Sequence, residues 1–166
     1  MFKFKLILPL IFVFLYIWTS GCSQNEDQRE FENEAFSLPQ GITHTNNRGE
    51  IINGNSDPDD WRVSPFYQGL VFVDPAYPNP VLTNQQLSLQ IHLPFIDTIS
   101  TLFAYVMRDA IHYNFIKSET ALTLTVFIFD PVNEIARFSE NPQGLYRIVI
   151  VDDNDNVVTY GDVKIE

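Results

Sequence analysis

QLSLQIHL, from Gln86 to Leu93, carries the clearest alternation of apolar and polar residues in the chain. Its apolar residues, Leu87, Leu89, Ile91 and Leu93, occupy every second position. Because successive side chains of a β-strand point to opposite faces, this spacing predicts a strand with one face in a core and the other in water.

Strand patterns continue from Trp61 to the end of the 166-residue chain. The segment ALTLTVFIF, from 121 to 129, alternates again, with its leucines, Val126 and Ile128 opposite Thr123 and Thr125. Further strands are predicted at 68–73, 102–108, 111–116, 145–151 and 157–165, with a helix across 102–116 as an alternative and a bulge at Gly161 in the last strand. Seven strands separated by Pro, Asn, Asp and Gly turn signals predict an all-β fold, a two-sheet antiparallel sandwich.

The stretch DPAYPNPVLTNQQLSLQIHLP, which ends at Pro94, resembles the opening of bacterial immunoglobulin-like domains. Such domains occur in flagellar hook-capping proteins and as sorting domains of secreted proteins. In them a turn like Tyr77-Pro78-Asn79-Pro80 leads into a strand closed by Leu-Pro, and their last hairpin is similar to GLYRIVI and YGDVKIE here. The resemblance implies an immunoglobulin-like sandwich over residues 61–166. A secretion-sorting role is less favoured, because no cargo domain precedes the module.

The first 22 residues, MFKFKLILPLIFVFLYIWTSGC, read as a secretory leader, with two lysines, an apolar run of 13 residues and small residues before Cys22. The run is too short to cross a bilayer as a helix, which takes about 20 residues. The junction Thr19-Ser20-Gly21-Cys22 resembles the lipobox of bacterial lipoproteins. This resemblance implies removal of residues 1–21, acylation (palmitate) of Cys22 and, with Ser23 next, the outer membrane. A plain secretory signal and a retained membrane anchor are the alternatives.

Residues 22–60 form a polar segment with few apolar residues and no sustained period. Such composition buries too little apolar surface to offset the entropy of ordering, so it predicts a flexible tether. Acidic residues follow the lipid site at Glu26, Asp27, Glu30, Glu32 and Glu34. They are interpreted as part of a solvated stalk, with a surface-export signal as the alternative.

The charge of the chain excludes some partners. The formal net charge is −11, and loss of Lys3 and Lys5 with the leader leaves 8 basic against 21 acidic residues, or −13. Nucleic acids and anionic membrane surfaces both require clustered Lys and Arg, so neither is expected as a partner. Cys22 is the only cysteine, which excludes an intramolecular disulfide, a structural zinc cluster and a redox pair.

The usual enzyme motifs are absent from the sequence, and neither enzymatic activity nor a cofactor is expected. In DDNDN, Asp152, Asp153 and Asp155 resemble the start of a calcium loop, but the glycine and glutamate that such a loop needs are replaced by Val157 and Val163. A hairpin turn is favoured over a metal site. Other candidate ligands or anchors, each more simply explained by turns, surface or packing, are His44, His92, His112, Asp57, Asp59, Asp60, Tyr67, Tyr77, Tyr113 and Tyr160.

These observations predict a membrane-anchored, non-enzymatic interaction or structural module of the bacterial cell envelope. Its partner would be an envelope protein or a glycan, and its contact surfaces would be 75–84 and 131–143, because sandwiches bind through loops and edge strands. Alternatives are a cation-dependent or glycan-binding adhesin, a sorting domain, and a hydrolase in which carboxylates meet His92 or His112 only in three dimensions.

Overall fold

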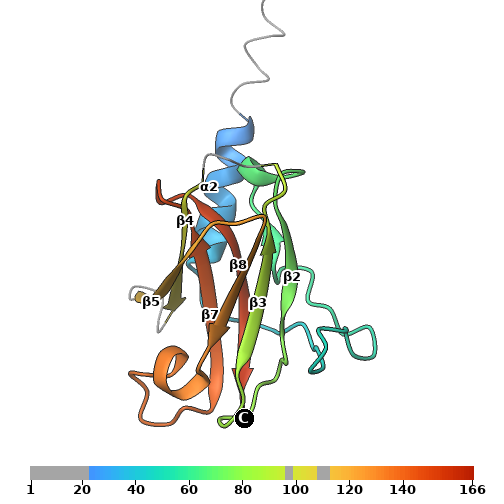
Figure 1. Ribbon diagram of the computed structural model, residues 1–166, viewed down its shortest axis with the longest axis vertical. Helices are drawn as coiled ribbons and strands as arrows, with labels where there is room; N and C mark the ends of the chain where they lie inside the picture. Colours follow the sequence, from blue (N-terminus) through green and yellow to red (C-terminus); the bar gives the residue numbers. More distant parts are fainter. Residues whose placement is uncertain (1–22, 96–98, 108–112) are drawn as a thin grey trace, which may run out of the picture.

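The computed structural model describes residues 23–95, 99–107 and 113–166 (Figure 1). Its elements are α2 (Ser23–Ala35), β1 (Arg62–Val63), η1 (Pro65–Tyr67), β2 (Phe72–Tyr77), β3 (Leu87–His92), β4 (Thr101–Met107), β5 (Tyr113–Thr120), β6 (Leu124–Phe129), η2 (Pro131–Ile135), β7 (Gly144–Val151) and β8 (Val157–Ile165). Residues 1–22, which include the expected leader and Cys22, lie outside the described residues. Within them, no helix combines the length and the apolar character needed to cross a membrane.

The strands form two antiparallel sheets that pack face to face. One sheet has the order β1-β8-β7-β4-β5 and the other has the order β2-β3-β6. The chain crosses between the sheets from β1 to β2, from β3 to β4, from β5 to β6 and from β6 to β7, so each sheet contains strands that are distant in the sequence. The predicted all-β, two-sheet antiparallel sandwich is confirmed.

The core between the sheets contains the strand that the alternation predicted. Leu87, Leu89 and Ile91 of β3 are fully buried, and they belong to one apolar cluster with Ile148 and Ile150 of β7. Burial of such aliphatic side chains contributes on the order of 2 kcal/mol each. The central strand of each sheet therefore supplies the core.

The aliphatic row of β6, which alternates with its phenylalanines, faces outward. Thr125, Phe127 and Phe129 are buried, whereas Leu124, Val126 and Ile128 are exposed. The rings of Phe127 and Phe129 stack with centroids 5.7 Å apart and an interplanar angle of 4°. Both faces of this strand carry apolar residues, and the bulkier phenylalanine pair occupies the core, which leaves an aliphatic row on the surface.

Two local predictions about strands are wrong. The strand expected to end before Asp74-Pro75 continues as β2 to Tyr77, with a register shift that accommodates the proline. The bulge expected at Gly161 lies instead opposite Ile150 and Val151, while Gly161 pairs regularly with Ile148. Glycine is required at 161 for another reason, because a Cβ there would stand 2.3 Å from the Trp61 ring.

The described part of the region 102–116 forms strands β4 and β5, which pair with each other, rather than a helix.

The structure also corrects the flexible tether expected at residues 22–60. From Ser23 to Ala35 the chain forms α2, which packs on the outer face of the five-stranded sheet (Figure 1). Phe31 and Ala35 are buried there, and the Phe31 ring lies 5.0 Å from that of Tyr160. Phe31 and Ala35, one helical turn apart, are the only buried apolar residues among the described side chains of the helix, so no apolar period is visible in the sequence.

Residues 36–60 run along the side of the sandwich and are held by hydrogen bonds. Thr45 N donates to Asn79 O at 2.9 Å, and Thr45 Oγ1 donates to Ala76 O at 2.7 Å. Thr43 N donates to a carboxylate oxygen of Asp60 at 2.6 Å. These bonds join residues from distant parts of the chain, which explains why a polar segment is ordered despite its composition.

Candidate functional site

A buried ion pair lies beneath the end of α2. Arg147 of β7 donates to both carboxylate oxygens of Asp162 on β8, at 2.7 and 2.9 Å, and the two residues are only 5% and 1% exposed. The same guanidinium donates to the main-chain oxygens of Glu34 and Ser37. These bonds fasten the end of α2 to the sheet.

Asp60 stands next to this pair. Its carboxylate accepts the main-chain N–H groups of Thr43 and Asp162, at 2.6 and 2.7 Å. Burial raises the pKa of Asp60 to about 7, and the nearby charges of Asp162 and Asp57 act in the same direction. A polar cleft of about 480 Å³ opens over these residues. The described ranges contain no group of three or more His, Cys, Asp or Glu residues placed to hold a metal ion.

The Asp152 carboxylate is occupied by its own turn. It accepts hydrogen bonds from the main chain of Asn154 and Asn156, from the Asn156 side chain and from the Tyr67 hydroxyl. Partial burial opposes ionisation of Asp152, but the bonds from Tyr67 and Asn156 outweigh it and lower the pKa. Asp153 accepts from the Ser100 hydroxyl. The three aspartates considered as calcium ligands therefore do not converge, since Asp155 lies at φ 62° in the turn and is exposed.

The histidine candidates are separated from one another. His92 Nε2 lies 2.9 Å from a carboxylate oxygen of Asp74, and both side chains are on the exposed face of the β2–β3–β6 sheet. His44 is in the segment beside the sandwich, where its main chain bonds to Asn55 and Ile52. His112 lies outside the described residues. The His92–Asp74 pair is the only contact between a histidine and a carboxylate in the described part of the chain.

Most of the tyrosines considered as anchors serve the fold. Tyr67 donates to Asp152, Tyr160 is buried under α2, and Tyr77 Oη accepts from the Gln90 side chain at 2.6 Å. Tyr113 is exposed and packs against Tyr105, with ring centroids 5.4 Å apart. Of the four, Tyr113 is the one whose ring is available on the surface.

The first expected contact surface, 75–84, is partly interior. The Asn79 side chain is fully buried, and its amide donates to Thr43 O at 3.1 Å and to Asp162 O at 2.9 Å. The main-chain N–H of Lys164 donates to Asn79 Oδ1 at 3.0 Å. This side chain therefore joins three segments of the protein and is unavailable to a partner.

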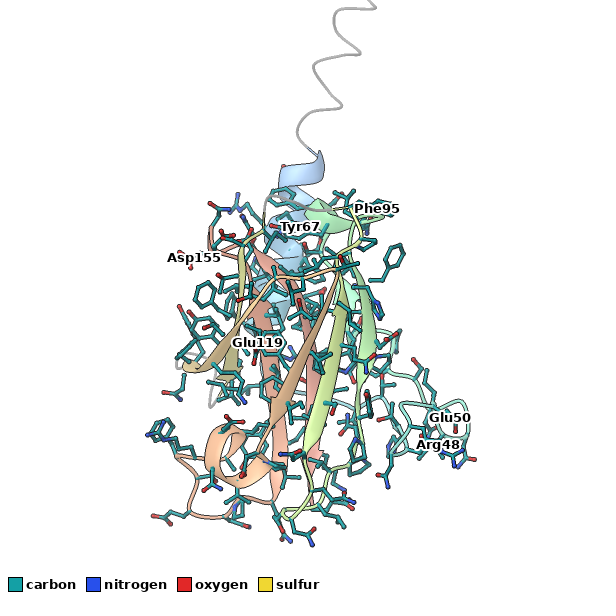
Figure 2. The ribbon with its side chains drawn as sticks, in the orientation of Figure 1. Arg48, Glu50, Tyr67, Phe95, Glu119 and Asp155 are labelled. Atoms are coloured by element: carbon teal, nitrogen blue, oxygen red, sulfur yellow. The ribbon has the colours of Figure 1, made fainter. Side chains whose placement is uncertain are left out.

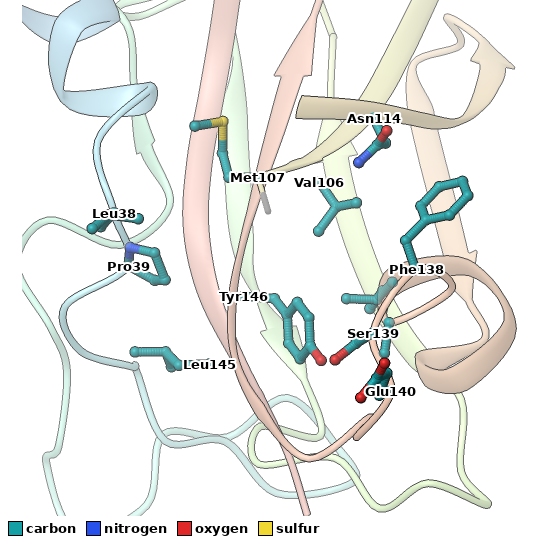
Figure 3. A pocket seen from close by; sticks show the side chains of 12 residues that line it. Leu38, Pro39, Val106, Met107, Asn114, Phe138, Ser139, Glu140, Leu145 and Tyr146 are labelled. Atoms are coloured by element: carbon teal, nitrogen blue, oxygen red, sulfur yellow. The ribbon is translucent and has the colours of Figure 1, made fainter. Parts of the chain in front are cut away.

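The second expected surface, 131–143, forms one wall of an apolar cleft of about 510 Å³ (Figure 3). The other walls come from the end of β4, the start of β5, the start of β7 and the segment after α2. We refer to it as the apolar cleft, and its lining consists of Leu38, Pro39, Val106, Met107, Asn114, Ile135, Ala136, Phe138, Ser139, Glu140, Leu145 and Tyr146. Eight of these residues are aliphatic or aromatic side chains or proline, with Ala136 beside them, and the other three are Asn114, Ser139 and Glu140. The cleft therefore suits a ligand that carries apolar groups beside polar ones.

The wall formed by 131–143 is held in place by its own hydrogen bonds. The Asp130 carboxylate accepts hydrogen bonds from the main-chain N–H groups of Val132 and Asn133, and the Glu134 carboxylate accepts one from the main-chain N–H of Asp130. These reciprocal bonds cap the start of η2. Lys117 of β5 pairs with Glu134 at 2.7 Å. The bonds from Asn133 lower the pKa of Asp130. The cleft is thus preformed by local capping rather than by a loose loop.

The polar side chains that line the apolar cleft are Asn114, Ser139, Glu140 and the hydroxyl of Tyr146. Tyr146 Oη donates to Pro142 O at 3.0 Å, and Ser139 Oγ donates to Asn141 O at 2.6 Å. Both hydroxyls are bonded to the main chain of the wall, and the lining contains neither histidine nor cysteine. Among these lining residues, neither the Ser139 nor the Tyr146 hydroxyl is hydrogen-bonded to a side-chain base.

No protein-family model matches the sequence, and a search of curated proteins finds no match.

Proposed function

We propose that this chain is a membrane-anchored, non-enzymatic module of the bacterial cell envelope that binds an apolar segment of a partner envelope protein. The anchor is Cys22, acylated after removal of residues 1–21, and the binding site is the apolar cleft. The observation that carries the proposal is the place of the 131–143 segment, which lines this cleft and lies at the end of the sandwich opposite the one where α2 begins (orange in Figure 1). An anchor at one end and a binding site towards the other suit a protein that holds a partner near a membrane.

The lining of the apolar cleft favours a protein segment over a glycan. Phe138 and Leu145 are exposed apolar side chains of its lining, and aliphatic or aromatic side chains or proline make up eight of the twelve lining residues. A cleft of about 510 Å³ falls in the usual range for small binding sites, which is roughly 300–1,000 Å³. Two or three apolar side chains of a partner would fill it, and their transfer from water would drive binding.

A hydrolytic role is less well supported by the geometry. The His92–Asp74 pair lies on the exposed face of β3 and β2, outside the apolar cleft. A hydrolase that works through a covalent intermediate needs a nucleophile within hydrogen-bond reach of such a base, in a pocket that positions the substrate. In the part of the chain that the structure describes, His92 contacts only Asp74 in this way.

The binding role can be tested by crosslinking in intact cells. A photoreactive residue at Phe138 should yield an adduct with one stoichiometric envelope protein, whereas the same residue at Arg48, on the exposed loop beside the sandwich (Figure 2), should not. Leu145→Asp should abolish the adduct, and because this leucine is 36% exposed, the melting temperature of the variant is measured beside it to show that the chain is folded. Absence of an adduct, together with turnover of a glycan or peptide by the purified chain, would defeat the proposal.

The anchor has a separate test. Metabolic labelling with a fatty-acid probe should mark the wild-type chain and leave Cys22→Ser unlabelled. Persistent labelling of Cys22→Ser would show that acylation occurs elsewhere and would remove the membrane part of the proposal.

A further inference from the structure

The end of the sandwich where α2 begins is formed by several loops. Strands β2, β4, β6 and β8 begin at this end, and strands β3, β5 and β7 finish there, as their antiparallel registers require. Figure 1 shows the first turns of α2 extending past these loops. We call this region the anchor end, and it contains η1 and the loops at 68–71, 93–95, 121–123 and 152–156.

Apolar side chains are exposed at the anchor end. Phe95 is 71% exposed and Leu122 is 61% exposed, and the bond from Leu93 N to Thr123 O at 2.9 Å brings their two loops together. Phe66 and Leu70 are also exposed, in and just after η1. Figure 2 shows the Phe95 ring pointing away from the body of the protein. Four large apolar side chains in adjoining loops exceed the single exposed residues that are normal on a surface.

The path of the chain places the acylation site beside this end. Residues 1–22 lie outside the described ranges, and α2 begins at Ser23. Cys22 therefore directly precedes the helix in the sequence. The helix is fixed to the sandwich at Phe31 and Ala35, and Phe66 N donates to the Gln28 side chain at 3.3 Å. With no flexible spacer between Cys22 and the sandwich, acyl chains on this residue would hold the anchor end close to the lipid.

We propose that the anchor end rests on the membrane surface, with Phe66, Leu70, Phe95 and Leu122 in the headgroup region of the bilayer. This inference rests on the proposed acylation of Cys22. It makes the sandwich stand on the bilayer in one orientation, with the apolar cleft directed away from the lipid. Several exposed apolar side chains add contacts of the kind that hold interfacial proteins at the headgroup boundary, in addition to the acyl chains.

The charges at the anchor end select the kind of lipid. Glu26, Asp27 and Glu30 lie on the first turns of α2, and Asp153 and Asp155 lie in the β7–β8 turn. Anionic headgroups would repel these carboxylates, since an anionic surface attracts only basic segments. A zwitterionic phospholipid surface carries no such penalty and is the surface that fits.

Spin labelling tests this orientation directly. The acylated full chain is placed in zwitterionic phosphatidylcholine vesicles, with a label on Phe95→Cys or, as a control, on Asn84→Cys in the exposed β2–β3 loop at the opposite end. Acylation blocks Cys22, so each introduced thiol is the only reactive one. The ratio of oxygen to nickel-chelate accessibility should be several-fold higher at position 95 than at position 84. Leu122→Cys provides a second reporter if Phe95→Cys fails to fold.

The possible results separate the two proposals. Equal ratios at positions 95 and 84 in a chain that floats with the vesicles would overturn the proposed orientation and leave the acyl anchor intact. A chain bearing no acyl group, which would not float, would overturn the anchor itself. Replacing Phe66 and Phe95 by serine should lower the ratio at Leu122→Cys several-fold while the acylated chain still floats, and an unchanged ratio would contradict the role of these rings.

Discussion

Arg147 and Asp162 form a two-point ion pair on neighbouring strands of the five-stranded sheet, with both side chains almost fully buried. The pair also receives the end of α2, because Arg147 Nη1 donates to Glu34 O at 2.7 Å. It is the point at which the N-terminal segment, β7 and β8 meet. Loss of one partner would leave the other charge buried without compensation.

We therefore expect Arg147→Ala to lower the free energy of unfolding by about 3–5 kcal/mol, the cost of an uncompensated buried charge. Urea denaturation followed by tryptophan fluorescence measures this difference. The control is Arg48→Ala, which removes an exposed arginine and should change stability by less than about 0.5 kcal/mol. Equal effects of the two substitutions would show that the ion pair does not bear on stability.

Asp60 should make stability depend on pH. Its folded pKa of about 7 lies above the ordinary value of 3.8, so between these pH values the unfolded chain releases a proton that the folded chain keeps. The contribution of Asp60 is fully present below about pH 4 and is lost as pH rises to about 7, at up to roughly 1.4 kcal/mol per pH unit. Asp60→Asn lacks this component. Urea denaturation of both chains at pH 5 and pH 8 should give a smaller loss of stability for the variant, and identical losses would contradict the raised pKa.

The packing of α2 predicts a protected N-terminal segment. Phe31→Ala should lower the free energy of unfolding by about 3 kcal/mol, because a buried aromatic ring in contact with Tyr160 is removed. Arg29→Ala, on the exposed side of the same helix, is the matched control. Limited proteolysis of the wild type should leave a resistant fragment that begins at or before Ala35. A fragment beginning near Trp61 would indicate that the helix does not stay on the sheet.

The β7–β8 turn should be stable without calcium. Asp152 accepts from Tyr67, Asn154 and Asn156, so Asp152→Ala should cost about 2 kcal/mol through lost hydrogen bonds in the folded chain. Melting curves of the wild type with calcium and with a chelator should coincide. Asp155→Asn, which removes the exposed charge while keeping a residue that tolerates the φ of 62° there, should leave the melting temperature unchanged in both conditions. A rise of many degrees with micromolar calcium would instead indicate a cation site in this turn.

The sequence by itself determined the strand content and the fold class. In QLSLQIHL the period of two is local information, because the pleat of a strand assigns alternate side chains to opposite faces whatever its partners are. The turn residues between such segments mark where strands end. The same reasoning found the DDNDN turn and the 131–143 connection, which in the structure forms one wall of the apolar cleft.

Only the tertiary structure decided which face of β6 is buried and whether residues 23–60 are ordered. Leu124, Val126 and Ile128 alternate as regularly as the core residues of β3, but the Phe127–Phe129 pair occupies the space between the sheets. The segment before Trp61 holds few apolar residues, and its order comes from bonds to Asn79 and Asp162, far along the chain. Burial and hydrogen-bond partners across such distances depend on how the sheets pack, and no local pattern carries that information.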